Sequence, residues 1–335
     1  MIDRPWVFMC AGGGSIGSLV KIIKQNNPKK KLYGIDANIN INNNHKKLFN
    51  KFFTVPLPHE DDFISNLINI LNNIGPSMLI PGADEEALAI SNFRDVLKEK
   101  NILCNVMIKN IITSIIDKFY LNQKISEFNS DFSVQCIQVN NNIELKKSCI
   151  NMGYPAKKII LKPIIGRGRR STYIISEDYY ENKIKDMIPY INLDKVIKKN
   201  LIKDNEMMIM QYVDGEAITI DVLANKGKIV QTIIRKWNEK WRFPFPGQKI
   251  ISDSNVDELI KIISKIIKLH GLIDIDAIKT SDGRIIFLEI NPRPSGSVAV
   301  SEIAGIPIFS MLEKVLEGIN INKIDFKNFK EVKAI

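Results

Sequence analysis

The chain has 335 residues, of which 45% are hydrophobic and 25% are charged, so it is long enough for two or three packed units and too apolar for a disordered protein. Its net charge is +10, but the lysines are scattered among Ile and Asn and do not interleave with aromatic residues on one element. This distribution favours a solvated basic surface, and no nucleic-acid partner is predicted.

The first 112 residues alternate short apolar runs with amphipathic stretches, which predicts a parallel sheet covered by helices, as in a Rossmann-like domain. After the first run comes AGGGSIGS, in which Gly12, Gly14 and Gly17 satisfy G-x-G-x-x-G, and Asp36 lies 19 residues beyond Gly17. This pattern is the fingerprint of an NAD site. A glycine-rich turn that serves only helix packing has the same pattern, so the residues alone leave both interpretations open.

A middle unit is predicted from residue 113 to 210, with a helical passage first, then strands, then a helical pair at 177–199. Lys162 ends an apolar strand in this unit, and Gly166 and Gly168 follow in the turn IIGRGRR. Backbone N–H groups and a lysine charge are suited to covering phosphate. An ordinary hairpin fits these residues equally well.

Two further segments are candidates for nucleotide contacts. Lys118, in IIDKFYLNQK, is a candidate for a second phosphate contact, with a solvated helix lysine as the simpler interpretation. Gly215 and Glu216 stand at a break between two strands in QYVDGEAITIDV, where backbone groups suit an adenine edge and the carboxylate suits ribose hydroxyls. Neither segment is specific by itself.

The C-terminal unit, residues 211–335, is predicted to consist mainly of strands with a helical end. Turn dipeptides punctuate its apolar runs, and each predicts a hairpin. They are Asp214-Gly215, Lys226-Gly227 and Asp282-Gly283.

The most explicit chemistry lies in FLEINPRPSG. Glu289 and Asn291 are two residues apart at the end of an apolar strand, so their side chains share one face. Asp276 lies on the other arm of the predicted hairpin, with Asp274 as a competitor on the same face. Two carboxylates and an amide oxygen suit Mg²⁺, and Arg293 presents a fork of donors to a phosphate or carboxylate. Ordinary acids on an exposed hairpin are the alternative.

Other residue types exclude several classes of site. The four cysteines have no C-x-x-C spacing and the three histidines no ligand spacing, so a histidine-bound transition metal is not predicted, and the cysteines fit a reducing compartment. No apolar run approaches 18 residues, and the N-terminus does not resemble a signal peptide. A cytoplasmic protein without a membrane partner is predicted.

In order and spacing, these motifs resemble those of ATP-grasp ligases. The matching pieces are AGGGSIGS, IPGADEE, IDK, LKP followed by GRGR, QYVDGE, GLIDID and LEINPRPSG. The pattern is most similar to carbamoyl-phosphate-synthase halves, D-alanine:D-alanine ligases and pyrrolysine-pathway ligases. The resemblance implies an α/β ATP-grasp fold with an N-terminal Rossmann-like (pre-ATP-grasp) domain at 1–112, an α+β lid subdomain at 113–210 and a C-terminal antiparallel-sheet subdomain at 211–335, which carries the Mg/ATP and substrate sites.

The resemblance also assigns roles to single residues. The expected contacts to ATP are Lys118, Lys162, Gly166, Gly168, Gln211, Tyr212, Val213 and Glu216. Within this set the two lysines bind phosphate, the 211–213 segment binds adenine and Glu216 binds ribose. The expected Mg²⁺ ligands are Asp276, Glu289 and Asn291. The expected catalytic residues are Lys162, Arg293, which steadies the transferred phosphate, and Arg235, a substrate or phosphate contact.

Two positions depart from the pattern of relatives, and one motif changes its meaning. Relatives often have Glu where this chain has Gln211, and some have Gln where it has Asp276. We expect nucleotide binding to be retained and the metal to be held well. The first domain of such ligases does not bind NAD, so AGGGSIGS is then structural or a substrate contact.

The reaction implied is an ATP-dependent ligation of a carboxylate to an amine through an acyl phosphate, with release of ADP and phosphate. It uses ATP and Mg²⁺, with Mn²⁺ as a substitute, and small-molecule substrates, of which an amino acid is expected. A homodimer is one expected assembly. Phosphorylation of bicarbonate or carbamate, as in carbamoyl-phosphate synthase, is the alternative. Two more distant alternatives are an NAD-binding oxidoreductase and a basic binding protein that has no enzymatic activity. The choice of substrate depends on loops such as RKWNEKWRFPFPGQK, which have no readable code.

Overall fold

The computed structural model describes most of the chain. The described residues are 4–166, 168, 170–178, 184–185, 188–202, 206–237 and 247–325. Arg167 and Arg169 of the GRGR turn and residues 238–246 of the loop expected to choose the substrate lie outside this set.

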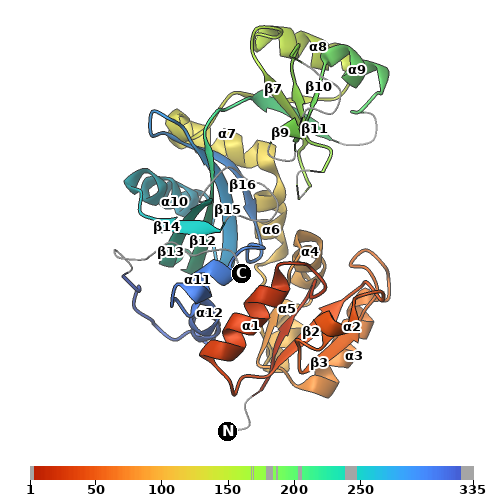
Figure 1. Ribbon diagram of the computed structural model, residues 1–335, viewed down its shortest axis with the longest axis vertical. Helices are drawn as coiled ribbons and strands as arrows, with labels where there is room; N and C mark the ends of the chain where they lie inside the picture. Colours follow the sequence, from red (N-terminus) through yellow and green to blue (C-terminus); the bar gives the residue numbers. More distant parts are fainter. Residues whose placement is uncertain are drawn as a thin grey trace.

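The N-terminal unit is a parallel sheet with the strand order β3-β2-β1-β4-β5. Its strands are β1 (Trp6–Phe8), β2 (Leu32–Asp36), β3 (Lys51–Thr54), β4 (Met78–Ile80) and β5 (Leu103–Cys104). Its helices are α1 (Ile16–Asn26), α2 (Asn43–Lys46), α3 (Phe63–Ile74), α4 (Asp84–Ser91) and α5 (Arg94–Glu99). Parallel neighbours require crossover connections, which the helices supply here. The predicted parallel, helix-covered sheet is therefore confirmed (Figure 1).

The middle unit is a mixed sheet with the order β6-β11-β7-β8-β10-β9. Helices α6 (Lys109–Ile116) and α7 (Lys118–Phe128) lead into it. Its strands are β6 (Cys136–Val139), β7 (Ile159–Pro163), β8 (Tyr173–Ile175), β9 (Ile184–Lys185), β10 (Ile188–Ile191) and β11 (Met207–Gln211). Helices α8 (Asn142–Asn151) and α9 (Leu193–Lys198) cover it. The helical pair predicted at 177–199 lies partly outside the described residues. Among those of the range that are described, α9 is the only helix, and the apolar run of β10 pairs with β8 instead.

The C-terminal unit is an antiparallel sheet with the order β14-β13-β12-β15-β16. Its strands are β12 (Glu216–Asn225), β13 (Lys228–Trp237), β14 (Gln248–Ile251), β15 (Gly271–Lys279) and β16 (Ile285–Asn291). Helices α10 (Ser254–Ile266), α11 (Ala299–Ile303) and α12 (Ile308–Leu316) complete the unit.

Two of the three predicted hairpins are confirmed. Lys226-Gly227 joins β12 to β13, with positive φ angles of 50° and 92° that suit a tight hairpin turn. Asp282-Gly283 joins β15 to β16. The hairpin predicted at Asp214-Gly215 is wrong, because the strands on its two sides, β11 and β12, belong to different sheets.

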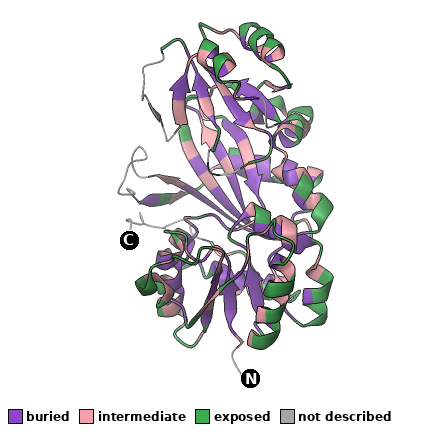
Figure 2. Cartoon of the chain, turned by 90° about the vertical axis from the view of Figure 1, so that its right-hand side faces the viewer, coloured by how far each residue is buried: buried purple, intermediate pink, exposed green. Residues whose placement is uncertain are grey.

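The hydrophobic cores show which units are packed together. One core contains Val7 of the parallel sheet and Ile275 of the antiparallel sheet, and a second contains Phe8 and Leu223 from the same two sheets. The middle sheet has a core of its own, which includes Leu161. Figure 2 shows the buried strands of the sheets and the exposed outer sides of the helices. The N-terminal and C-terminal units therefore form one packed body, and the middle sheet folds around a separate core.

Within the part of the chain that the structure describes, no helix combines the length and the apolar character needed to cross a membrane.

Candidate active site

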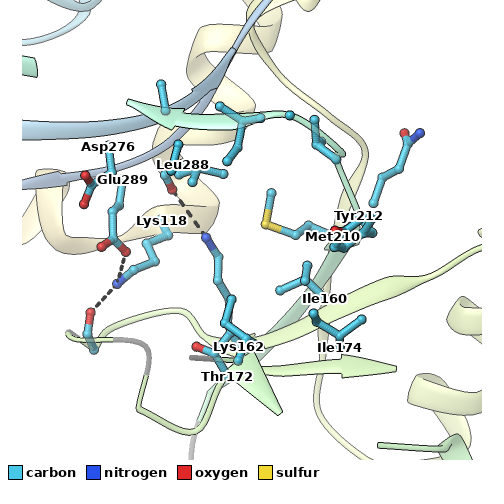
Figure 3. Close-up of a pocket in the computed structure, with 18 of the residues that line it drawn as sticks. Lys118, Ile160, Lys162, Thr172, Ile174, Met210, Tyr212, Asp276, Leu288 and Glu289 are labelled. Atoms are coloured by element: carbon cyan, nitrogen blue, oxygen red, sulfur yellow. Dashed lines mark hydrogen bonds and ion pairs between the residues drawn. The ribbon is translucent and has the colours of Figure 1, made fainter. Parts of the chain in front are cut away.

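A cavity lies between the middle and the C-terminal sheets, and we call it the lid cavity. Ile160, Ile174, Met210 and Leu288 form apolar walls, and Tyr212 lies beside Met210 (Figure 3). All four predicted adenine and lid contacts at Gln211, Tyr212, Val213 and Gly166 line this cavity. An apolar slot with backbone groups at its edge suits a flat heterocycle.

Two lysines stand at the polar end of the lid cavity. Lys118 begins α7 and is buried; its Nζ donates to the Gly166 carbonyl oxygen at 2.5 Å and lies 3.5 Å from a Glu289 carboxylate oxygen. Lys162 Nζ donates to the Leu288 carbonyl oxygen at 3.4 Å. The simpler interpretation of Lys118 as a solvated lysine is therefore wrong, and both ammonium groups face the same space (Figure 3).

A β-bulge shapes the acidic end of this cavity. Asp276 of β15 pairs with Glu289 of β16, but the next residue, Ala277, pairs with Phe287, so Leu288 is an extra residue in the ladder. An extra residue is left out of the regular strand hydrogen bonds. Its carbonyl oxygen is the one that accepts from Lys162. The predicted pairing of Asp276 with Glu289 is confirmed.

The remaining polar groups of the hairpin interlock on the same side. Asn291 Nδ2 donates to Asp274 Oδ2 at 3.1 Å and to Asp276 Oδ2 at 3.5 Å. Arg293 Nη1 donates to Asp274 Oδ2 at 3.4 Å, and Arg293 Nε lies 3.2 Å from Asp84 Oδ1. Burial lowers the pKa of Arg293, but the surrounding carboxylates, Asp84 first, outweigh it and raise that pKa overall. Arg293 therefore stays charged at the centre of an acidic cluster.

A second cavity, the central cavity, begins where the lid cavity ends. Asp276 and Glu289 line both cavities, and Asn291 and Arg293 line the central one. Its volume is about 490 Å³. Gly168, a predicted phosphate contact, lies on the central cavity and not on the lid cavity. The two carboxylates thus stand at the junction of two connected spaces.

The glycine-rich loop of the N-terminal unit closes the central cavity from the other side. Gly14 and Ser15 line it, and Ser15 also lines a third cavity of about 420 Å³ next to Gly12. Asp36, the expected ribose ligand of an NAD site, accepts instead from the backbone N–H of Gly12 at 2.7 Å and of Asn38 at 2.8 Å. The loop therefore uses its acid to hold its own backbone.

Two predicted contacts lie away from these cavities. Glu216, expected to hold ribose, is exposed, pairs with Lys236 at 2.9 Å and does not line the lid cavity. Arg235, expected to touch substrate or phosphate, is fully buried. Its guanidinium donates to Asp221, Gln248, Ser295 and Ser297 at distances of 2.5 to 3.0 Å. The direct contact with substrate or phosphate that was expected of Arg235 is therefore not supported, because its N–H donors are already occupied by protein groups.

Several polar residues of the site carry no local sequence signal. Thr219 donates to Asp276 Oδ1 at 3.2 Å from the neighbouring strand, and Asp84 reaches Arg293 from the N-terminal unit. Gln248 lines the central cavity from β14. IPGADEE marks the segment of Asp84 as part of the motif set, but only the assembled fold places these three residues.

The comparisons with known proteins agree with this architecture. Residues 203–334 match the sequence model of a family described as ATP-grasp in the biosynthetic pathway with Ter operon. No curated protein sequence matches the chain significantly.

Solved structures match nearly the whole chain. The biotin carboxylase domain of 2-oxoglutarate carboxylase from Hydrogenobacter thermophilus, solved with MgADP, ADP and bicarbonate, is 16% identical with a TM-score of 0.67, over 95% of this chain and 71% of that chain. Biotin carboxylase from Campylobacter jejuni, in complex with β-γ-ATP, is 17% identical with a TM-score of 0.66, over 96% and 72%. N5-carboxyaminoimidazole synthetase from Staphylococcus aureus, in complex with ADP, is 17% identical with a TM-score of 0.65, over 97% and 80%. Likeness at this level of identity shows the fold, and the predicted ATP-grasp fold is confirmed.

Proposed function

We propose that this protein is an ATP-dependent carboxylate–amine ligase, which forms an amide through an acyl phosphate and releases ADP and phosphate. The observation that carries the proposal is the junction of the two cavities at Asp276 and Glu289. A nucleotide in the lid cavity would present its terminal phosphate at that junction, and the central cavity would present the acceptor from the other side. The fold comparisons support nucleotide use, since similar structures were solved with ADP, MgADP or an ATP analogue.

The donor set at the junction fits Mg²⁺. Asp276 and Glu289 are register partners, and the amide nitrogen of Asn291 is turned toward two carboxylates, so we assign its oxygen to the metal. Among the described residues, no group of three His, Cys, Asp or Glu side chains is arranged as a complete metal site. A site with two carboxylates and an amide suits an ion whose other ligands are phosphate oxygens and water. Bound Mg²⁺ would neutralise the charge that develops on the phosphoryl group.

In the first step the substrate carboxylate oxygen attacks the γ-phosphorus, and the bond to the bridging oxygen breaks so that ADP leaves. Lys118, Lys162 and Arg293 stabilise the equatorial phosphoryl charge, which is the main contribution that a protein makes to this transfer. In the second step the amine nitrogen attacks the acyl carbon, the C–N bond forms, phosphate leaves and the ammonium proton is lost. No protein nucleophile is needed.

The test is a screen for ADP release with carboxylic acids and amino acids, with bicarbonate as the competing substrate. Bicarbonate is included because the Hydrogenobacter structure contains it. The cavity volume of about 490 Å³ favours an acceptor much larger than bicarbonate. ADP release that depends on bicarbonate alone would replace the ligase proposal with the phosphorylation of bicarbonate.

Nucleotide choice gives a first expected result. MgATP should raise the melting temperature, because a ligand at 100 times its Kd stabilises the folded state by about 2.7 kcal/mol. NAD and NADP should leave it unchanged, since Asp36 is engaged by the loop backbone. Thermal unfolding with each nucleotide measures both. Stabilisation by NAD that Gly14→Val removes would restore the dinucleotide interpretation.

The pH dependence of nucleotide affinity gives a second expected result. Burial lowers the pKa of Lys162 to about 8, against the opposing effect of Glu289. The lysine is charged below this pKa and neutral above it, so affinity for a non-hydrolysable ATP analogue should be highest below pH 8 and fall roughly tenfold between pH 7 and pH 9. Isothermal titration calorimetry with Mg²⁺ at each pH measures this.

Lys162→Gln should bind more weakly at pH 7 and lose this pH dependence. Lys124→Gln is the control, because Lys124 is exposed and, among the described residues, forms its ion pair with Glu127 on the surface. An equal slope in Lys162→Gln and wild type would assign the pH dependence to another group.

A further inference from the structure

We propose that the central cavity selects an extended primary amine with a hydrogen-bond acceptor at its far end, held by Asp274 at the amine and by Gln248 at the acceptor. The inference rests on the proposed ligase function and names the class of its amine substrate. It is carried by two residues that line the same cavity, each of which has one buried polar atom without a hydrogen-bond partner among the described residues.

Gln248 presents a donor whose identity is well determined. The side chain is 1% exposed, and its Oε1 accepts from Arg235 Nη1 at 2.7 Å. A guanidinium only donates, so the oxygen of the amide must face Arg235 and the nitrogen must face away. The amide nitrogen has no hydrogen-bond partner among the described residues. Arg235 is thus a positioning residue, which orients the Gln248 amide.

Asp274 presents an acceptor in the same way. The side chain is 4% exposed, and its Oδ2 accepts from Asn291 and from Arg293. Its other oxygen, Oδ1, is buried and has no hydrogen-bond partner in the described part of the chain. Both residues line the central cavity. Buried polar atoms are almost always partnered, so an unpaired donor and an unpaired acceptor on two residues that line one cavity favour a ligand that pairs with both.

The positions of the two groups set the shape of that ligand. Asp274 lies on β15 and Gln248 on β14, three strand spacings apart in the sheet order, or about 14 Å between backbones. Asp274 is two residues from Asp276, so an amine at Asp274 lies beside the junction where the acyl phosphate would form. Gln248 lies at the far end, where it donates to a carboxylate, amide or hydroxyl oxygen. One short molecule such as ammonia cannot satisfy both groups.

Binding to the MgADP form tests the proposal without turnover. The panel pairs amines that match the two groups with amines that lack the far acceptor: 4-aminobutyrate with butylamine, and glutamine with norvaline. Calorimetry is run on the wild type, Asp274→Asn, Gln248→Glu and the control Asp257→Asn, which removes an exposed acid. We expect the matched amines to bind at least tenfold more tightly than their partners to the wild type and to the control.

Each variant has its own expected result. Asp274→Asn should weaken the binding of all the amines at least tenfold and leave the affinity for MgADP unchanged. Gln248→Glu keeps an acceptor for Arg235 and removes the donor, so it should abolish the preference for 4-aminobutyrate over butylamine. It carries the test if Asp274→Asn does not fold.

Three results would overturn the proposal. They are wild-type binding of no amine in the panel, a preference that survives in Gln248→Glu, and a loss of Mg²⁺-dependent nucleotide binding in Asp274→Asn, which would make Asp274 a metal ligand. The ligase function is tested separately by trapping the acyl phosphate with hydroxylamine, which needs no amine site. Hydroxamate formation without amine binding would reject this inference alone. If neither hydroxamate formation nor amine binding were observed, both this inference and the ligase function would be rejected.

Discussion

Glu289→Gln should fold normally, retain nucleotide affinity and lose most ADP-forming turnover. Glu289 stands at the junction of the two cavities opposite Asp276 and 3.5 Å from Lys118. Its charge is needed most as negative charge develops on the transferred phosphoryl group, because the Mg²⁺ that we propose it binds would neutralise that charge. We expect kcat to fall about 10³-fold, or about 4 kcal/mol of transition-state stabilisation, with a smaller change in KM.

Glu216→Gln is the matched control for this experiment. It makes the same chemical change at another carboxylate. The motif pattern predicts that Glu216 binds ribose, but in the structure its side chain is exposed beside Lys236. We expect near wild-type turnover from it. The measurement is steady-state ADP release at saturating Mg²⁺ with the substrate found in the screen. A Glu289→Gln enzyme with near wild-type kcat would reject the metal site and with it the proposed function.

Asp221→Ala should cause a larger loss of stability than the loss of any other ion pair among the described residues. Asp221 accepts from Arg235 Nε at 3.0 Å and from Nη2 at 2.7 Å, and both side chains are fully buried. Removing the carboxylate leaves an unpaired guanidinium charge in a fully buried site. We expect the free energy of unfolding to fall by about 3–5 kcal/mol, measured by urea denaturation.

Two comparisons test the cause of this loss. Replacing both partners by apolar residues, Asp221→Leu with Arg235→Met, should cost less than Asp221→Ala alone, because no buried charge remains unpaired. Glu216→Ala breaks the exposed pair with Lys236 and should cost under about 1 kcal/mol. An Asp221→Ala protein within about 1 kcal/mol of the wild type would show that water or another group compensates Arg235.

Features that depend on residues close together in the chain could be predicted from the amino-acid sequence. Apolar alternation places Glu289 and Asn291 on one strand face, and Asp282-Gly283 supplies the turn that brings Asp276 beside Glu289. Both signals are local, because side-chain direction alternates along a strand and few residues fit a tight turn. The order of the motifs then predicted the ATP-grasp fold, which the comparisons confirm.

What covers each strand face, and which distant strands pair, could be read from the three-dimensional structure alone. The strand pattern around Arg235 is the same whether that residue faces substrate or the interior, and the packing of Ser295 and Ser297 over it makes it a buried positioning residue. The bulge at Leu288 and the junction of the cavities arise from pairings between segments far apart in sequence. Such contacts depend on the free energy of the whole assembly, so no short stretch of residues specifies them.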